Sequence, residues 1–404
     1  MGKLSHTFPE QPLSSLIVLR NAELYAPARL GRQDLLIAGG TIVAMAPELP
    51  ELPAVLRVEE VELGGLRVIP GLIDGHVHLT GGGGEAGPHT RVPPLKVTAL
   101  TAGGITSAIG VLGTDDAVRS TAELVTAARG LRQLGFSAWC HTGGYHLPLT
   151  TLTGTVRGDI ALVEEIIGVG EVAISDHRSS QPTLDDLLRI ASESHVGGLM
   201  SGKAGIVHLH VGDGARGLDL VRQALDKSEL PARVFNPTHV NRRRALFTEA
   251  MELVARGPCI DITAFPVADG EDAWTAEDAL ERYWDAGLAP ERVTVSSDGG
   301  GCLPRFDTDG RVSGLDVGAP GALMGVLGAL LGRGRRLEQV LPPFTSNVAA
   351  LLRLDAKGRL GVGAHADLVV LAADNAVRHV MARGRWHRFN GQPRIQGPFE
   401  KEDS

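Results

Sequence analysis

The chain has 404 residues, of which 52 are glycine and only 4% are aromatic. This length suits one large α/β barrel with a smaller domain, or two or three ordinary domains. A core poor in aromatics must be built from Val, Leu, Ile and Ala, as in a barrel of buried parallel strands. The net charge of -8 is mild for this length and argues against an electrostatic nucleic-acid surface.

Cysteine content and the first apolar stretch bear on the compartment. Cys140, Cys259 and Cys302 are too few and too scattered for a disulfide framework or a thiolate zinc cluster, so a reducing compartment is the simplest interpretation. Residues 1–15 are polar, and the apolar run after them is broken by Arg20. We therefore expect no signal peptide and no membrane span, and a cytoplasmic protein without membrane or nucleic-acid partners.

Both ends of the chain have a sequence pattern that is typical of β structure. Short β-prone runs separated by Gly-Gly turns fill residues 15–69, and similar runs recur around Gly384. The pattern predicts one small β-sandwich domain assembled from both termini, residues 1–69 and 358–404. A barrel domain is expected over residues 70–357.

The middle of the chain alternates between apolar runs and amphipathic stretches with helical periodicity. Eight strands alternating with helices predict a (β/α)8 TIM-like barrel. The expected strands are His76–Leu79, Ile105–Val111, Ser137–Thr142, Val172–Ser175, Val207–His210, Val234–Thr238, Cys259–Ile262 and Val293–Ser296. The clearer helices are Asp116–Leu134, Thr183–Ser194, Gly217–Lys227, Arg243–Arg256 and Thr275–Ala286.

The first expected barrel strand carries a His-x-His pair, His76 and His78. Side chains two residues apart in a strand point the same way, so the pair directs two nitrogen ligands at one point. The alternative is a pair of hydrogen-bonded strand histidines, and the pair alone does not decide between the two.

Further ligand-type residues stand near the ends of other expected strands, and Glu171 stands at the start of the fourth. Active sites of such barrels form at the C-terminal ends of strands. Four histidines and two carboxylates at one rim predict a site for two divalent ions with nitrogen and oxygen ligands, with Zn2+ favoured. Two metals lower the pKa of a bridging water and polarise a carbonyl, and Asp298 can act as both ligand and proton shuttle. The six candidate ligands are His76, His78, Glu171, His210, His239 and Asp298.

This order of residues resembles the amidohydrolase superfamily, whose strand-1 signature is similar to Pro70-Gly-Leu-Ile-Asp-Gly-His-Val-His78. From about Leu16 to Glu400, internal motifs resemble the isoaspartyl dipeptidase (β-aspartyl peptidase) family. They are Gly81-Gly-Gly-Gly-Glu85-Ala-Gly87, Gly113-Thr-Asp115, Gly144-Tyr145-His146, Ala173-Ile-Ser-Asp-His-Arg178, His239-Val-Asn-Arg242 and Asp261-Ile-Thr263.

The resemblance implies a zinc metallopeptidase that cleaves the β-aspartyl amide bond of short peptides, mainly dipeptides, with a hydroxide that bridges two metals. It also implies a homo-oligomer. Dihydroorotase-like or hydantoinase-like cyclic amidases and N-acyl amino acid deacylases share the metal ligands, and they are the nearest alternative. A non-catalytic scaffold would have lost ligands, and all six are present.

Substrate-binding roles follow from the same resemblance. It implies that Glu85 binds the substrate α-ammonium and that Arg178 and Arg242 bind the free α-carboxylate, which guanidinium groups suit. Tyr145 matches the tyrosine that polarises the scissile carbonyl, and Thr114 adds a polar contact. A flexible loop, structural ion pairs and simple packing are the alternatives for these residues.

Two positions depart from the family pattern. Glu171 stands where better-known members carry a carboxylated lysine. Because glutamate is shorter, we expect the backbone to approach the metals through a local bulge, and Glu171 to bridge them without carbon dioxide. A rim salt bridge beside a single metal is the alternative. Cys302 replaces a serine expected near the substrate carboxylate, as a weak donor or a bystander and not as a nucleophile.

Overall fold

A curled parallel sheet lies at the centre of the computed structural model, which describes residues 16–306 and 311–400. Six strands among these residues pair in parallel, in the order β11-β10-β9-β8-β7-β6. Their bounds are β6 Leu72–Val77, β7 Ile105–Gly110, β8 Ser137–Thr142, β9 Ile166–Ile174, β10 Ile206–Val211 and β11 Phe235–Thr238.

Two further strands continue this sheet towards closure. β12 (Ile260–Thr263) and β13 (Val293–Ser296) pair in parallel, β12 packs beside β11, and β13 packs beside β6. A parallel bridge between Val77 and Gly299 joins the two edges. The strands thus confirm the expected TIM-like barrel, and their buried Val, Ile and Leu side chains form its core.

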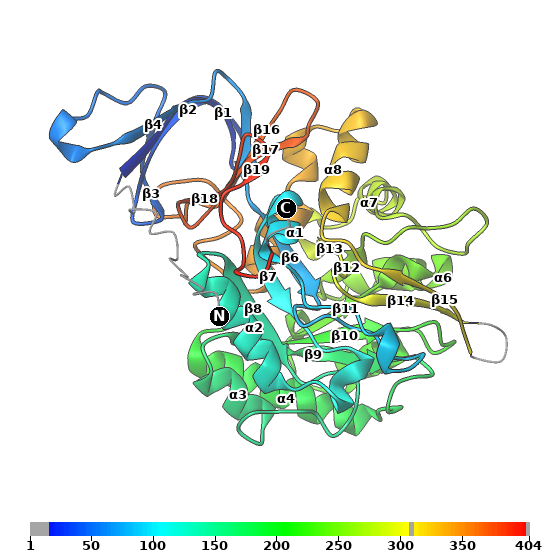
Figure 1. The fold of residues 1–404 in the computed structure, drawn as a ribbon. Coiled ribbons are helices and arrows are strands. Elements are labelled where there is room, and N and C mark those ends of the chain that lie inside the picture. Colours follow the sequence, from blue (N-terminus) through cyan, green and yellow to red (C-terminus); the bar gives the residue numbers. More distant parts are fainter. Residues whose placement is uncertain (1–15, 307–310, 401–404) are drawn as a thin grey trace.

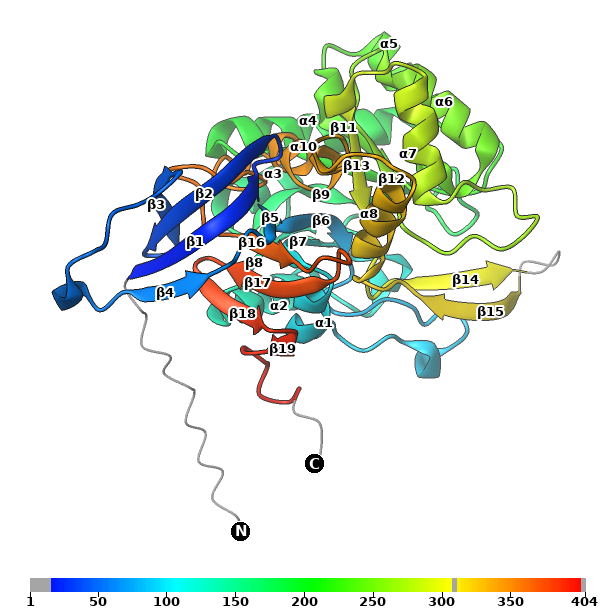
Figure 2. The same ribbon diagram turned by 90° about the horizontal axis from the view of Figure 1, so that it is seen from above.

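Helices surround the barrel (Figures 1 and 2). The longest helix, α4, begins at a capping box, in which the Thr183 side chain accepts a hydrogen bond from the Asp186 amide. Threonine with an acidic residue three positions later is a typical helix start. The helix bounds are α1 Val97–Ala102, α2 Thr121–Gln133, α3 Val156–Leu162, α4 Leu184–Ser201, α5 Asp219–Lys227, α6 Arg244–Val254, α7 Ala276–Asp285, α8 Ala322–Gly332, α9 Leu337–Val340 and α10 Ser346–Leu351.

Strands from both ends of the chain form one second sheet, which Figures 1 and 2 show in blue and red beside the barrel. β5 joins the two ends, because it pairs in parallel with β1 and antiparallel with β16. Among the described residues the sheet has nine strands, β1 Leu16–Tyr25, β2 Arg29–Ala38, β3 Thr41–Ala46, β4 Glu59–Glu62, β5 Arg67–Pro70, β16 Leu368–Leu371, β17 Val377–Ala382, β18 Arg385–Phe389 and β19 Gln392–Pro393.

The contribution of both termini to one β unit therefore agrees with the expectation. Its description as a sandwich and the domain limits 1–69, 70–357 and 358–404 stay predictions. Residues 1–15, 307–310 and 401–404 of those limits lie outside the described residues. No helix in the described part of the chain combines the length and apolar character needed to cross a membrane.

A hairpin that the sequence pattern did not indicate follows the barrel. β14 (Cys302–Phe306) pairs antiparallel with β15 (Val312–Val317), and the hairpin projects from the molecule on the right of Figure 1. It begins four residues after Asp298, so its base lies at the same rim of the barrel as the candidate ligands.

Two expected strand positions were wrong, and both concern the candidate site. The first barrel strand is β6, Leu72–Val77, and not His76–Leu79, so His78 lies beyond its end. The fourth, β9, begins at Ile166, so Glu171 lies inside the strand and not at its start. The first part of this strand, Ile166-Ile-Gly-Val-Gly170, was not predicted because its two glycines weaken the strand pattern in the sequence. In the folded protein the burial of its side chains stabilises the strand in spite of the glycines.

Candidate metal centre and substrate pocket

Glu171 lies at the centre of the candidate ligands. Its Oε1 is 3.4 Å from His78 Nε2 and 3.6 Å from His76 Nε2. Its Oε2 is 3.1 Å from His210 Nδ1 and 3.3 Å from His239 Nε2. Each carboxylate oxygen thus faces one pair of imidazoles.

Asp298 completes the first of these pairs. Its Oδ1 lies 3.1 Å from His78 Nε2 and 3.5 Å from His76 Nε2. The two nitrogens and the oxygen form a buried group within 4.8 Å of one another, and His76, Glu171 and His239 form a second such group. His76 belongs to both.

The donor atoms fit divalent cations. His76 Nε2 and Asp298 Oδ1 are buried, and among the described residues neither has a hydrogen-bond partner. Buried polar atoms are ordinarily satisfied, and imidazole with carboxylate is the ligand set that zinc and similar ions take in catalytic sites. A cation between these groups satisfies both atoms at once.

Electrostatics keep the two carboxylates ionised. Burial alone would raise the pKa of Asp298, but the neighbouring His76 and His78 imidazoles hold it well below its usual range. Burial acts on Glu171 in the same way, and His76 with His210 and His239 lowers its pKa well below the ordinary value. Anionic carboxylates are the form that binds metal. Burial lowers the pKa of His239 to about 3, so its ring is neutral. The carboxylates of Glu171 and Asp298 outweigh burial at the other pair, and they raise the pKa of His78 to about 9 and that of His76 well above normal, so a metal must displace a proton from each of these two rings.

The backbone at Glu171 is displaced from regular pairing. Val169 is opposite Val207 and Val172 is opposite Leu209, so two residues of β9, Gly170 and Glu171, face one residue of β10. Such a bulge bends a strand and redirects a side chain. The expected local bulge is therefore present at this position.

Left-handed backbone conformations turn the chain directly after two strands. His239 follows β11 with φ 62°, and Asp298 lies two residues beyond β13 with φ 52°. Non-glycine residues adopt this conformation at a cost and are found where the surroundings enforce it, above all at functional sites. Here both turns direct a candidate ligand into the barrel mouth.

A cavity of about 490 Å³ opens over these ligands. His76 is completely buried beneath it. The other candidate site residues all line its wall, namely His78, Glu85, Thr114, Tyr145, Glu171, Arg178, His210, His239, Arg242, Asp298 and Cys302.

Glu85 and Arg178 lie side by side in this cavity. Arg178 Nη1 is 3.5 Å from Glu85 Oε1, and Thr114 donates a hydrogen bond of 2.8 Å to the same oxygen. Arg178 also forms a two-point ion pair with Asp176, through Nε at 3.0 Å and Nη2 at 2.8 Å. An acid and a guanidinium are therefore presented together on one wall, in a fixed orientation.

Asp176 is a site residue that the sequence analysis missed. Its Oδ2 lies 3.0 Å from His210 Nε2, and the pKa of its carboxyl, which burial would raise, is held far below normal by His210 and Arg178. The available signal was its position directly after strand β9, where the rim rule predicts functional residues.

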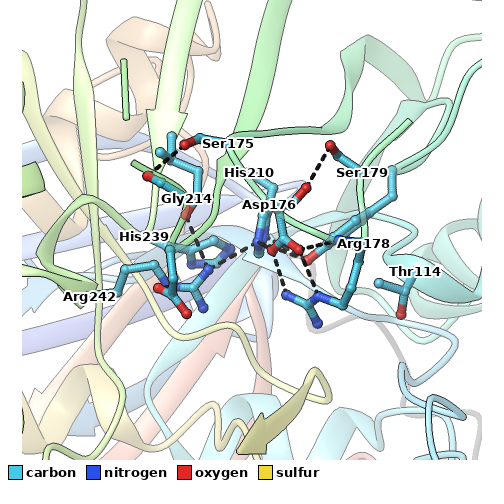
Figure 3. Close-up of polar contacts among 12 residues, drawn as sticks. Thr114, Ser175, Asp176, Arg178, Ser179, His210, Gly214, His239 and Arg242 are labelled. Carbon is cyan, nitrogen blue, oxygen red and sulfur yellow. Dashed lines mark hydrogen bonds and ion pairs between the residues drawn. The ribbon is translucent and has the colours of Figure 1, made fainter. Parts of the chain in front are cut away.

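His210 stands apart from the two close groups. Its ring lies 2.7 Å from the Tyr145 hydroxyl through Nδ1 and 3.0 Å from Arg242 Nη1 through Nε2. Figure 3 shows Arg178 and Thr114 on one side of His210 and Asp176, and Arg242 on the other. The cavity thus has a basic group on both sides of the candidate centre.

The glycine-rich loop before Glu85 packs closely against neighbouring loops. A Cβ on Gly81, which has φ +75°, would lie 2.0 Å from the Val92 carbonyl oxygen, so only glycine fits. The Gly82 amide donates to the Gly300 carbonyl and does not face a ligand. The glycines permit close packing against neighbouring loops, and this packing positions Glu85.

Cys302 begins β14 and faces this loop, since a Cβ on Gly83 would lie 3.5 Å from its Sγ. Burial raises the pKa of the Cys302 thiol to about 12. A thiol that stays protonated is a poor nucleophile. That Cys302 is a weak donor or a bystander stays a prediction.

Comparison with known proteins identifies the family. No protein-family model matches the chain. A solved β-aspartyl dipeptidase from Fervidobacterium islandicum AW-1, in complex with the β-Asp-Leu dipeptide, is 38% identical, covers 95% of this chain and 99% of its own, and superposes with a TM-score of 0.90. The chain belongs to the β-aspartyl dipeptidase family of the amidohydrolase superfamily.

Other relatives agree at the level of the superfamily. A second structure of a β-aspartyl dipeptidase from the same organism is 36% identical, covers 95% of this chain and all of that chain (100%), and has a TM-score of 0.86. An allantoinase from Deinococcus radiodurans is 26% identical over 93% of this chain and 91% of its own length. The chain is thus a hydrolase of the amidohydrolase superfamily, and the expected family assignment is confirmed.

Proposed function

We propose that this protein hydrolyses the β-aspartyl amide bond of short peptides, mainly dipeptides. The observation that carries the proposal is the cavity itself, in which a candidate metal centre and a zwitterion-binding wall stand face to face. The bound β-Asp-Leu of the relative that is 38% identical supports the same substrate class.

The wall suits the α-carbon end of an isoaspartyl residue. Ammonium and carboxylate groups sit on one carbon there, so their binding groups must be neighbours, and Glu85 and Arg178 are 3.5 Å apart. Glu85 would take the ammonium and Arg178 the carboxylate, with Arg242 as a second cation on the far side. In an α-aspartyl peptide the α-carboxyl group forms the peptide bond, so the α-carbon carries the ammonium but no free carboxylate.

The chemistry is divided among the residues over the barrel mouth. The six candidate ligands would hold two divalent ions, with zinc favoured, and such a pair supplies Lewis acidity and lowers the pKa of water. The Tyr145 hydroxyl, whose pKa burial raises well above normal, stays protonated and can donate a hydrogen bond to a developing oxyanion. The Asp298 carboxylate accepts a proton from the attacking water and returns it to the leaving amine.

Glu171 would bridge the two ions without carbon dioxide. Its two oxygens face separate imidazole pairs, and the bulge moves its short side chain towards these imidazoles.

We further propose that the protein is a cytoplasmic homo-oligomer without nucleic-acid or membrane partners. Residues 1–69 with 358–404 would form a β-sandwich domain beside the barrel domain of residues 70–357.

Substrate selection tests this function. Metal-loaded protein is expected to release leucine from β-Asp-Leu and to leave α-Asp-Leu, allantoin, dihydroorotate and N-acetyl-leucine intact, as followed by amino-acid analysis and chromatography. Asp298→Asn protein serves as the background. Turnover of a cyclic amide or of N-acetyl-leucine, with β-Asp-Leu untouched, would assign the chain to the other amidohydrolase classes. Two bound metals with no turnover would favour a scaffold.

Thr114→Val is expected to lower kcat/KM for β-Asp-Leu by about 10- to 100-fold, chiefly through KM. Thr114 holds Glu85 in place through a hydrogen bond to its carboxylate. A hydrogen bond to a charged group contributes about 1.5–3 kcal/mol, and about 1.4 kcal/mol corresponds to a factor of ten in binding. Steady-state kinetics measure the effect. Thr126→Val removes a hydroxyl that donates to the Ala122 carbonyl on exposed helix α2 and should change nothing. An unchanged KM in Thr114→Val would contradict the prediction.

A further inference from the structure

A buried row of hydrogen-bonded groups runs behind His76. His76 Nδ1 lies 2.8 Å from His208 Nε2, and His208 Nδ1 lies 2.7 Å from Asn236 Oδ1. The Asn236 Nδ2 then donates a hydrogen bond of 2.8 Å to the backbone carbonyl of Cys259. The three side chains are each at most 2% exposed, so water does not compete for these bonds.

The barrel itself produces this row. His208 on β10 and Asn236 on β11 are register partners in the parallel pair, which places their side chains next to each other inside the barrel. Cys259 directly precedes β12, and His76 lies on β6 across the interior. Three strands thus contribute one side chain each, and the residue before a fourth strand contributes the backbone carbonyl.

The direction of every proton in the row follows from its last member. A backbone carbonyl can only accept, so the Asn236 amide nitrogen must face Cys259, and its oxygen must face His208. An amide oxygen also only accepts, so His208 carries its proton on Nδ1. The neutral His208 ring then offers Nε2 as an acceptor, and His76 must donate from Nδ1. The lone pair of His76 Nε2 is thereby left directed into the candidate centre.

We propose that Asn236 and His208 are positioning residues that hold His76 in its Nδ1-protonated tautomer and so make Nε2 a ready metal ligand. This inference rests on the metal centre of the proposed function. Ring-nitrogen partners that fix the tautomer of a ligating histidine tune metal affinity. His76 matters most in this respect, because it belongs to both close ligand groups.

The other candidate ligand histidines lack an equivalent anchor. His210 Nε2 lies 3.0 Å from Asp176 Oδ2, which can only accept, and 3.0 Å from Arg242 Nη1, which can only donate, so these two partners favour opposite tautomers. His239 Nδ1 lies 2.8 Å from the Thr263 hydroxyl, which can donate or accept and so leaves the tautomer free. His78 Nδ1 has no partner among the described residues. The row behind His76 is distinguished by ending on a backbone carbonyl, the orientation of which cannot reverse.

The test compares Asn236→Leu with a matched control. Leucine has nearly the same shape and removes the acceptor, so His208 can protonate on Nε2 and drive the proton of His76 to its own Nε2. We expect zinc affinity, measured by competition with a chromophoric chelator, to fall about 10- to 100-fold. Asn347→Leu removes another buried amide, which donates to the carbonyls of Pro290 and Val293, and should bind zinc like the wild type.

Nitrogen NMR reads the tautomer without any assay of activity. The carboxylates of Glu171 and Asp298 raise the pKa of His76 well above its usual value, so the spectrum is recorded at a pH where the ring is neutral. In metal-free wild-type protein labelled at histidine, with signals assigned by His76→Gln, the neutral His76 ring should show a protonated Nδ1 and a bare Nε2. Asn236→Asp keeps an acceptor for His208 but not the amide nitrogen, so it should preserve this pattern and the zinc affinity. A neutral His76 ring with a protonated Nε2 and a bare Nδ1 in the wild type would overturn the proposal, even if Asn236→Leu fails to fold. Equal losses in the Asp and Leu variants would also overturn it, because they would indicate a structural role. Wild-type protein that binds no metal would instead refute the proposed function.

Discussion

Glu171→Gln is expected to reduce the bound metal from two ions per chain to one or none, and to lower kcat/KM for β-Asp-Leu by more than about 10³-fold. Metal ions stabilise the transition state by several kcal/mol, and about 1.4 kcal/mol corresponds to each factor of ten. Glutamine keeps the shape but replaces one oxygen by an NH2 group, which cannot be a ligand. Each oxygen of Glu171 faces its own imidazole pair, so either orientation of the amide deprives one pair.

Elemental analysis after metal loading and gel filtration measures the first effect, and steady-state kinetics the second. Glu165→Gln is the matched control, because Glu165 is a buried acid that is paired with Arg129 outside the cavity. Retention of two ions per chain by Glu171→Gln would eliminate the bridging role.

Carbon dioxide should be irrelevant to metal binding in this chain. Lys203, the lysine closest in sequence to the middle of the barrel, donates its three hydrogen bonds to the carbonyls of Ile160, Val163 and Ile166. Its ammonium is therefore committed to the backbone and does not reach the ligands. Metal loading under bicarbonate-free conditions is expected to give the same two ions, and a requirement for bicarbonate would contradict a glutamate bridge.

Glu85→Gln is expected to lower kcat/KM for β-Asp-Leu by about 30-fold to several thousand-fold. Removing one member of a buried, hydrogen-bonded charge pair costs about 2–5 kcal/mol. This energy gives the expected range of kcat/KM, since about 1.4 kcal/mol corresponds to each factor of ten. Glu85 and the substrate ammonium would form such a pair inside the cavity. The neighbouring Arg178 would then meet the ammonium without an intervening anion, which weakens binding further.

N-succinyl-leucine makes the Glu85 prediction specific, since it is β-Asp-Leu without the α-ammonium. Wild type should cleave it poorly, and Glu85→Gln should cleave it no worse than the wild type does. A loss of the same size on both substrates would show that Glu85 supports the loop and does not recognise the ammonium.

Spacing along the chain was enough to predict the rim residues. His210 and His239 stand at or just beyond the ends of β10 and β11 as expected, because a parallel barrel brings all strand ends to one face whatever lies between them. Local pattern was not enough for Glu171. The two glycines at the start of β9 concealed the strand, and the bulge that presents Glu171 depends on pairing with β10, which is a non-local interaction.

The sequence by itself predicted the barrel, the candidate ligands, the candidate pocket residues and the family, because these predictions depend on periodicity and on motifs of adjacent residues. The tertiary structure alone decided which atoms meet: the division of the Glu171 oxygens between two imidazole pairs, Asp176 under His210, and the row from Cys259 to His76. These groups are far apart in the chain, and only closure of the barrel and the register of its strands bring them together.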